Sequence, residues 1–102
     1  MTVPEAFNAI ANSFHQDTFL FHNSLDSAIR GSISELTPEQ MRIAKDYLDE
    51  LLSGKYSREQ LIDIWSKSPA GSGGFGMPGP AEKFLGLIRA ALETLLASRE
   101  TE

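Results

Sequence analysis

The two histidines are the side chains best suited to acid–base or metal chemistry, and their spacing does not favour either. His15 and His22 stand seven residues apart, with Asp17 near the first. A helical zinc pair requires histidines four residues apart, so these two do not form one. The chain has no cysteine, which excludes disulfides, thiolate metal sites and cysteine nucleophiles. We therefore expect no metal, no cofactor and no catalytic residue, and we expect that the protein is not an enzyme.

A glycine-rich stretch has the spacing of a dinucleotide-binding motif. Residues 71–76 read Gly-Ser-Gly-Gly-Phe-Gly, which matches G-x-G-x-x-G. This motif binds a pyrophosphate where a strand precedes it and a helix opens within it. Here a helical pattern precedes the glycines, and Pro78 and Pro80 remove two N–H donors after them. We therefore interpret residues 69–80 as a flexible glycine-rich loop.

Acidic side chains recur on one face of two predicted helices. Three of them fall within positions 46–50, and two more stand four residues apart at positions 59 and 63. Like charges at this spacing destabilise an isolated helix by about 0.2–0.5 kcal/mol. A solvated face explains either helix alone, whereas two such faces on neighbouring helices favour a docking surface for lysines and arginines. The predicted protein-binding residues are Asp46, Asp49, Glu50, Glu59, Asp63 and Asp17.

The net charge of the chain indicates which kind of macromolecule it can bind. Fourteen acidic residues face nine basic ones, which gives a formal net charge of −5. A negative surface repels phosphate backbones, so it disfavours nucleic acid and favours a basic protein, although it also serves solubility alone. No apolar run approaches the roughly 20 residues of a membrane span, and the N-terminus lacks the pattern of a secretory signal. We expect a cytoplasmic protein that binds no membrane.

Helical periodicity and capping signals divide the chain into about five short helices. Thr37 and Ser57 each precede a glutamine by three residues, as in a capping box, and Pro38 and Pro80 suit helix starts. No stretch alternates with a period of two, so no sheet is predicted. We expect an all-α fold: one compact helical bundle spanning residues 1–102. The expected helices cover residues 4–13, 24–34, 37–53, 57–68 and 80–98.

The apolar side of these helices predicts the core. The core assignments are Leu48, Leu61, Trp65, Phe84 and Ile88. The stripe of the last helix also includes Leu87. Residues 14–23 are dense in aromatic side chains, and an extended or irregular segment there would place Phe14, Phe19 and Phe21 in the core.

Four stretches of the chain resemble the immunity proteins of bacterial contact-dependent growth inhibition systems. They are Phe14-His15-Gln16-Asp17, Tyr47–Gly54, Leu61–Trp65 and Phe84–Ile88, and the resemblance extends from about residue 14 to residue 92. It implies a protein that binds the C-terminal toxin domain of a delivered effector, often a basic nuclease, and blocks it. The glycine-rich residues 71–79 depart from the family's shorter, more acidic connector. A helical adaptor that pairs with itself or with another protein is the alternative.

Overall fold

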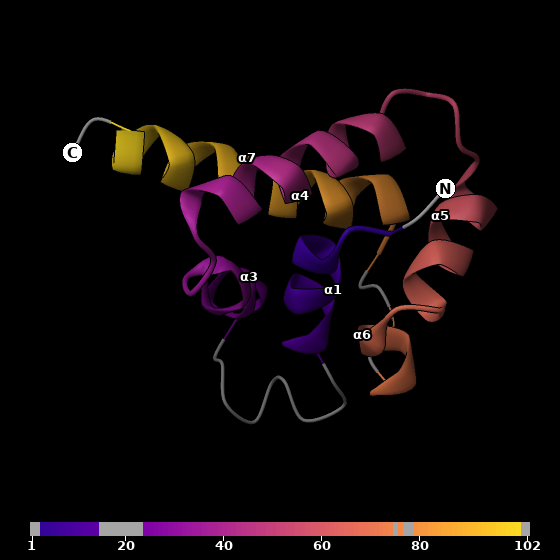
Figure 1. Cartoon of the computed structure of the whole chain (residues 1–102). Coiled ribbons are helices and arrows are strands. Elements are labelled where there is room, and N and C mark those ends of the chain that lie inside the picture. Colours follow the sequence, from indigo (N-terminus) through magenta and orange to yellow (C-terminus); the bar gives the residue numbers. More distant parts are fainter. Residues whose placement is uncertain (1–2, 15–23, 75, 77–78, 101–102) are drawn as a thin grey trace.

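Helices are the regular elements of the part of the chain that the computed structural model describes, namely residues 3–14, 24–74, 76 and 79–100. In chain order they are α1 (Glu5–Asn12), α3 (Leu25–Ile33), α4 (Pro38–Leu51), α5 (Arg58–Ser66), α6 (Pro69–Ser72) and α7 (Ala81–Glu100) (Figure 1). No strand occurs in these ranges, so the predicted all-α fold is confirmed. The five expected helices are all present, and α6 is an addition to them.

Capping boxes fix the starts of α4 and α5. The Thr37 hydroxyl accepts a hydrogen bond from the backbone N–H of Gln40 at 3.1 Å, and the Gln40 side chain accepts one from the N–H of Thr37 at 2.9 Å. Ser57 and Gln60 make the same reciprocal pair at the start of α5. These bonds satisfy N–H groups that have no partner within the helix. The two capping predictions are confirmed.

The helices surround α1 on several sides. Figure 1 shows α4 and α7 running side by side in opposite directions, with α1 packed against α4. The two flanks of α1 are covered by α3 and by α6, while α3 and α5 also reach α7. Every one of these helices contributes buried side chains to a single hydrophobic core. The arrangement places α3 and α5 on opposite sides of α1.

Aromatic rings join the helices at the centre of the core. Trp65 lies edge-to-face with Phe84 at 5.1 Å between ring centroids, with Phe14 at 5.7 Å and with Phe7 at 6.2 Å. Phe7 also makes an edge-to-face contact with Tyr47 at 5.0 Å. Such pairs contribute about 0.5–1.5 kcal/mol beyond the burial of their area. The rings therefore tie α1, α4, α5 and α7 together.

Most of the core predictions are confirmed. The five assigned side chains are buried, and Phe14 is buried with them. Phe19 and Phe21 lie outside the described residues. The assignment of Leu87 to the core stripe is wrong, because its side chain is 44% exposed while Leu85 and Leu96 are buried instead. The buried stripe of α7 is turned toward α4, and Leu87 falls at its margin on the side of α3.

The expectation of a loop over residues 69–80 is wrong for its first four residues, which form α6. Pro69 occupies the first turn, where its missing N–H costs no hydrogen bond. Ala70 is buried, and the backbone of Gly71 lies close against Ser66 at the end of α5. A Cβ atom added at Gly71 would lie 2.0 Å from the carbonyl oxygen of Ser66. Only glycine allows this approach, so Gly71 sets how α6 folds back onto α5.

We expect Gly71→Ala to lower the free energy of unfolding by about 1–3 kcal/mol, because the methyl group forces the backbone of α6 away from α5. The control is Gly76→Ala, since a Cβ at Gly76 meets no atom within 4 Å. The control should change stability by less than about 0.5 kcal/mol. Denaturant unfolding measures both variants, and equal losses would show that the Gly71 contact is not a constraint.

Trp65→Ala should cost roughly 3–5 kcal/mol, because it removes a side chain that is only 3% exposed and leaves a cavity among three rings. Ile62→Ala on the same helix is the matched control, since Ile62 is 48% exposed. A denaturation curve in which the two variants lose similar stability would contradict the central position of Trp65.

Candidate protein-binding surface

The structure places most of the predicted protein-binding residues on the outside of the molecule. Asp46 and Glu50 are exposed on α4, and Glu59 and Asp63 are exposed on α5. Asp49 is only half-exposed, between α4 and α7. Asp17 lies outside the described residues. The carboxylates therefore have different surroundings, and those surroundings decide which of them can attract a partner.

Asp49 joins α4 to α7 within the protein. Its carboxylate accepts a hydrogen bond from the Arg89 guanidinium of α7, and it accepts another from Lys45 Nζ at 3.1 Å. Arg89 also donates to Glu93 at 3.2 Å. The hydrogen bond from Arg89, aided by that from Lys45, lowers the pKa of Asp49 below its ordinary value. Two cations already neutralise Asp49, so it contributes little negative field to the surface.

Asp63 is also paired, but at the surface. Its carboxylate lies 2.9 Å from Lys67 Nζ, one helical turn further along, and both side chains are well exposed. Exposed pairs of this kind stabilise a protein little, and they separate readily when a partner offers another ion. Asp63 therefore stays available, although Lys67 offsets its charge in the free protein.

Three of the predicted protein-binding carboxylates differ from Asp49 and Asp63. Among the residues that the structure describes, no ion pair within 4.0 Å involves Asp46, Glu50 or Glu59. Glu50 lies near the end of α4, and Glu59 lies in the first turn of α5. They stand on either side of the connection between these helices, which Figure 1 shows diverging from that point. With Glu39 at the start of α4, these three groups are the exposed carboxylates of α4 and α5 that take part in no ion pair among the described residues.

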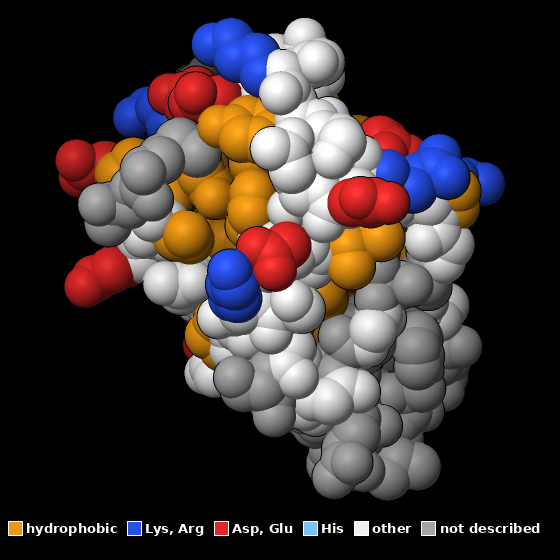
Figure 2. Space-filling model, turned by 90° about the vertical axis from the view of Figure 1, so that its right-hand side faces the viewer, with side chains coloured by type: hydrophobic (Ala, Val, Ile, Leu, Met, Phe, Trp, Pro, Cys, Tyr) orange, Lys and Arg blue, Asp and Glu red, His pale blue; other side chains and the backbone are white. Residues whose placement is uncertain are grey.

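Apolar side chains accompany the carboxylates. Ile62 of α5 is largely exposed, and Leu52, Tyr56 and Ile64 are partly buried at the edge of the core. Figure 2 views the side of the molecule that carries α5, and it shows hydrophobic side chains gathered with acidic and basic ones around them. An apolar centre with a charged rim is the usual build of a protein-binding surface. We call Asp46, Glu50, Glu59, Tyr56 and Ile62 the acidic surface.

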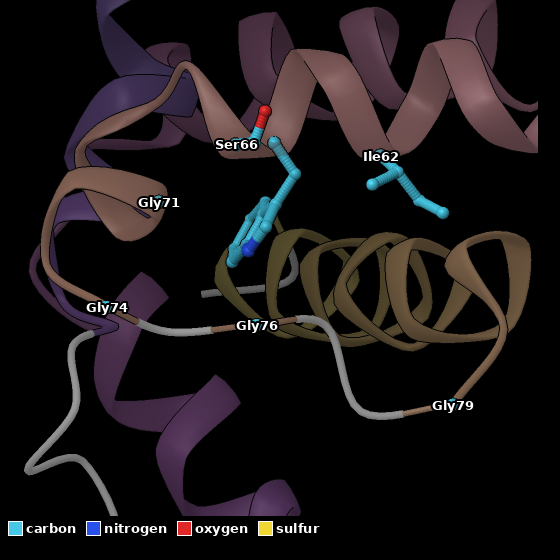
Figure 3. A pocket seen from close by; sticks show the side chains of 7 residues that line it. Ile62, Ser66, Gly71, Gly74, Gly76 and Gly79 are labelled. Carbon is cyan, nitrogen blue, oxygen red and sulfur yellow. The ribbon is translucent and has the colours of Figure 1, made fainter.

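A pocket of about 290 Å³ opens next to this surface, beneath α5. Figure 3 shows Ile62 and Ser66 on α5 above the glycine-rich chain, and Trp65 forms part of the wall. Among the described lining residues Ser66 carries a hydroxyl, and that hydroxyl donates to the Asp63 carbonyl at 2.9 Å. Helices α5 and α6, rather than a strand, precede Gly73. The described lining is mostly apolar or glycine, and it lacks the preceding strand that a dinucleotide site requires.

The described residues contain no group of three or more histidines, aspartates or glutamates that could hold a metal ion. His15 and His22 lie outside these residues. Within the same part of the chain, every helix is too short or too polar to cross a bilayer. Comparison with protein-family models, with curated proteins and with solved structures gives no match to this chain.

Sequence reasoning did not identify Arg89 as the partner of Asp49. Lys45 stands four residues before Asp49 on one helix, and that pairing is readable from spacing. Arg89 is 40 residues away, and only the packing of α7 along α4 brings it to the carboxylate. Sequence reasoning also did not name Ile62, although the helical spacing of Leu61, Ile64 and Trp65 leaves Ile62 off the buried face.

Asp49 should make stability depend on pH. Because its pKa is lowered in the folded protein, the unfolded chain binds more protons once the pH falls to about 4, and the free energy of unfolding then decreases. Asp49→Asn should make this decrease smaller between pH 7 and pH 3, as measured by denaturant unfolding at each pH. Asp46→Asn is the control, since Asp46 takes part in no ion pair with the described residues. Identical pH profiles for the two variants would contradict the role of Asp49.

Proposed function

We propose that this protein is an immunity protein: it binds the C-terminal toxin domain of a contact-dependent growth inhibition effector and blocks it by occupying its surface. The observation that carries the proposal is the acidic surface itself. Its three carboxylates take part in no ion pair among the described residues, and Glu59 stands on the same helix as the exposed Ile62. A protein built this way inhibits by binding, and it performs no chemistry of its own.

The unpaired carboxylates supply the first step of recognition. Toxin domains of the implied kind act on nucleic acid and are often basic. Exposed charges of opposite sign speed the encounter of two proteins, and they raise the association rate more than the final affinity. Asp46, Glu50 and Glu59 produce this attraction, whereas Asp49 does not because Arg89 and Lys45 neutralise it.

Apolar contact supplies the second step. Interface residues that carry much of the binding energy are large side chains that lose their contact with water on binding, and tyrosine is prominent among them. Tyr56 lies in the connection between α4 and α5, and Ile62 is exposed on the outer side of α5. Tyr56 lies between Glu50 and Glu59 along the chain, and Ile62 lies on the helix that carries Glu59, so a toxin drawn in by charge would meet them directly.

The first test is genetic and biochemical. A gene for a large secreted effector directly upstream of this chain would support the proposal. The C-terminal domain of that effector, co-expressed with this chain, should co-purify with it, and this chain should restore growth that the domain alone arrests. A domain that neither co-purifies nor is neutralised would overturn the proposal.

Reversing two of the unpaired charges tests the surface. Asp46→Lys combined with Glu50→Lys should slow association with the toxin domain by about tenfold or more, because attraction becomes repulsion at that site. Stopped-flow or surface-based binding kinetics measure the rate, and the growth assay reports loss of protection. The variant's thermal unfolding shows whether it remains folded.

The matched control is Glu35→Lys combined with Glu39→Lys. It changes the net charge by the same amount, but at the opposite end of α4. Glu35 lies just before that helix, Glu39 lies in its first turn, and both are exposed. The control should bind nearly as fast as the original protein. Equal slowing by both variants would show that net charge alone matters, and no slowing by either would show that the carboxylates are only a solvated face.

A further inference from the structure

A second apolar surface lies between α3 and α7, away from α5. It is a groove of about 560 Å³, and its lining is mostly aliphatic or small. Leu87 stands in it with 44% of its surface exposed. The lining residues are Asp26, Arg30, Ile33, Ser34, Leu87, Ala90, Ala91, Thr94, Leu95 and Ser98. Leu87 and the aliphatic lining together form an apolar surface that a second apolar surface can cover.

The charges of this groove differ from those of the acidic surface. Its two charged residues, Asp26 and Arg30, stand one helical turn apart on α3 with 3.1 Å between them, and both side chains are more than two-thirds exposed. They cancel, so the groove is neutral in a chain whose net charge is −5. A basic partner gains no attraction here. A second copy of this acidic chain meets no repulsion here.

We propose that the α3–α7 groove is the interface of a symmetric dimer of this chain. In a two-fold symmetric interface, the same patch of each copy faces that patch of the other copy. Each contact between two different residues therefore occurs twice, once in each direction. Asp26 of one copy can then pair with Arg30 of the other, and the reverse pair forms at the same time. Leu87 of each copy is covered by the groove of its partner. Because Asp26 and Arg30 carry opposite charges, the patch of one copy is complementary to the same patch of the other.

The dimer does not depend on the proposed immunity function. Figure 1 shows α3 and α5 on opposite sides of α1, so a dimer formed through α3 and α7 leaves the acidic surface of each copy free. Toxin binding and dimerisation can therefore succeed or fail separately in experiment.

Charge reversal and mixing test the two-fold pairing. The protein alone should sediment as a dimer that dissociates on dilution. Asp26→Arg places like charges opposite each other across the interface, and so does Arg30→Asp; each variant alone should dimerise at least roughly tenfold more weakly. An equimolar mixture of the two variants restores both opposite-charge pairs, so it should form the heterodimer. Analytical ultracentrifugation measures all three samples, and circular dichroism checks that each is folded.

The apolar contact has its own matched pair of variants. Leu87→Ser should weaken the dimer, whereas Ile43→Ser should not, because Ile43 is equally exposed but lies on α4 and outside the groove. A protein that stays monomeric at every concentration overturns the proposal. The proposal is also overturned if the mixture of the Asp26→Arg and Arg30→Asp variants does not form a dimer, or if the Leu87→Ser variant dimerises as strongly as the original protein. Toxin binding that is lost through Leu87→Ser while the protein remains monomeric would assign the groove to the toxin instead.

Discussion

The edge-to-face packing of Trp65 with Phe14 and Phe84 is the interaction on which the rest of the structure depends. Trp65 turns one side of α5 into the core, where it meets Phe14 just after α1 and Phe84 of α7. A helix buried on one side must present its other side to solvent. That rotation exposes Glu59 and Ile62 on the outside of α5. The aromatic core thus determines which residues of α5 a partner can reach.

Ion pairs then divide the carboxylates into two kinds. Asp49 is used inside the molecule, where Arg89 and Lys45 hold it between α4 and α7. Asp46, Glu50 and Glu59 have no such partner among the described residues, and they are left to act on the surroundings. Two carboxylates on one helix face can therefore differ completely in role. The groove between α3 and α7 is a third kind of surface. Its charged residues, Asp26 and Arg30, pair with each other, and Leu87 is exposed beside them.

Local sequence signals predicted the helices well, because their causes are local. The caps at Thr37 and Ser57 need only a glutamine three residues later, and the apolar spacing identified Trp65 and Phe84 as core. The errors arose where distant segments meet. Nothing near Leu87 shows that α7 turns its buried stripe toward α4. Likewise, the contact of Gly71 with the Ser66 carbonyl depends on how α6 folds back, and the pairing of Asp49 with Arg89 joins residues 40 positions apart.

The proposed encounter of an acidic surface with a basic toxin domain is tested most directly by the ionic-strength dependence of its association rate. At 0.1 M salt, exposed charges more than about 10 Å apart are largely screened from each other. The association rate of the unaltered protein with the effector's C-terminal domain should therefore fall steeply as salt rises, while the dissociation rate changes little. An association rate that is insensitive to salt would contradict the claim that the unpaired carboxylates of α4 and α5 draw the partner in.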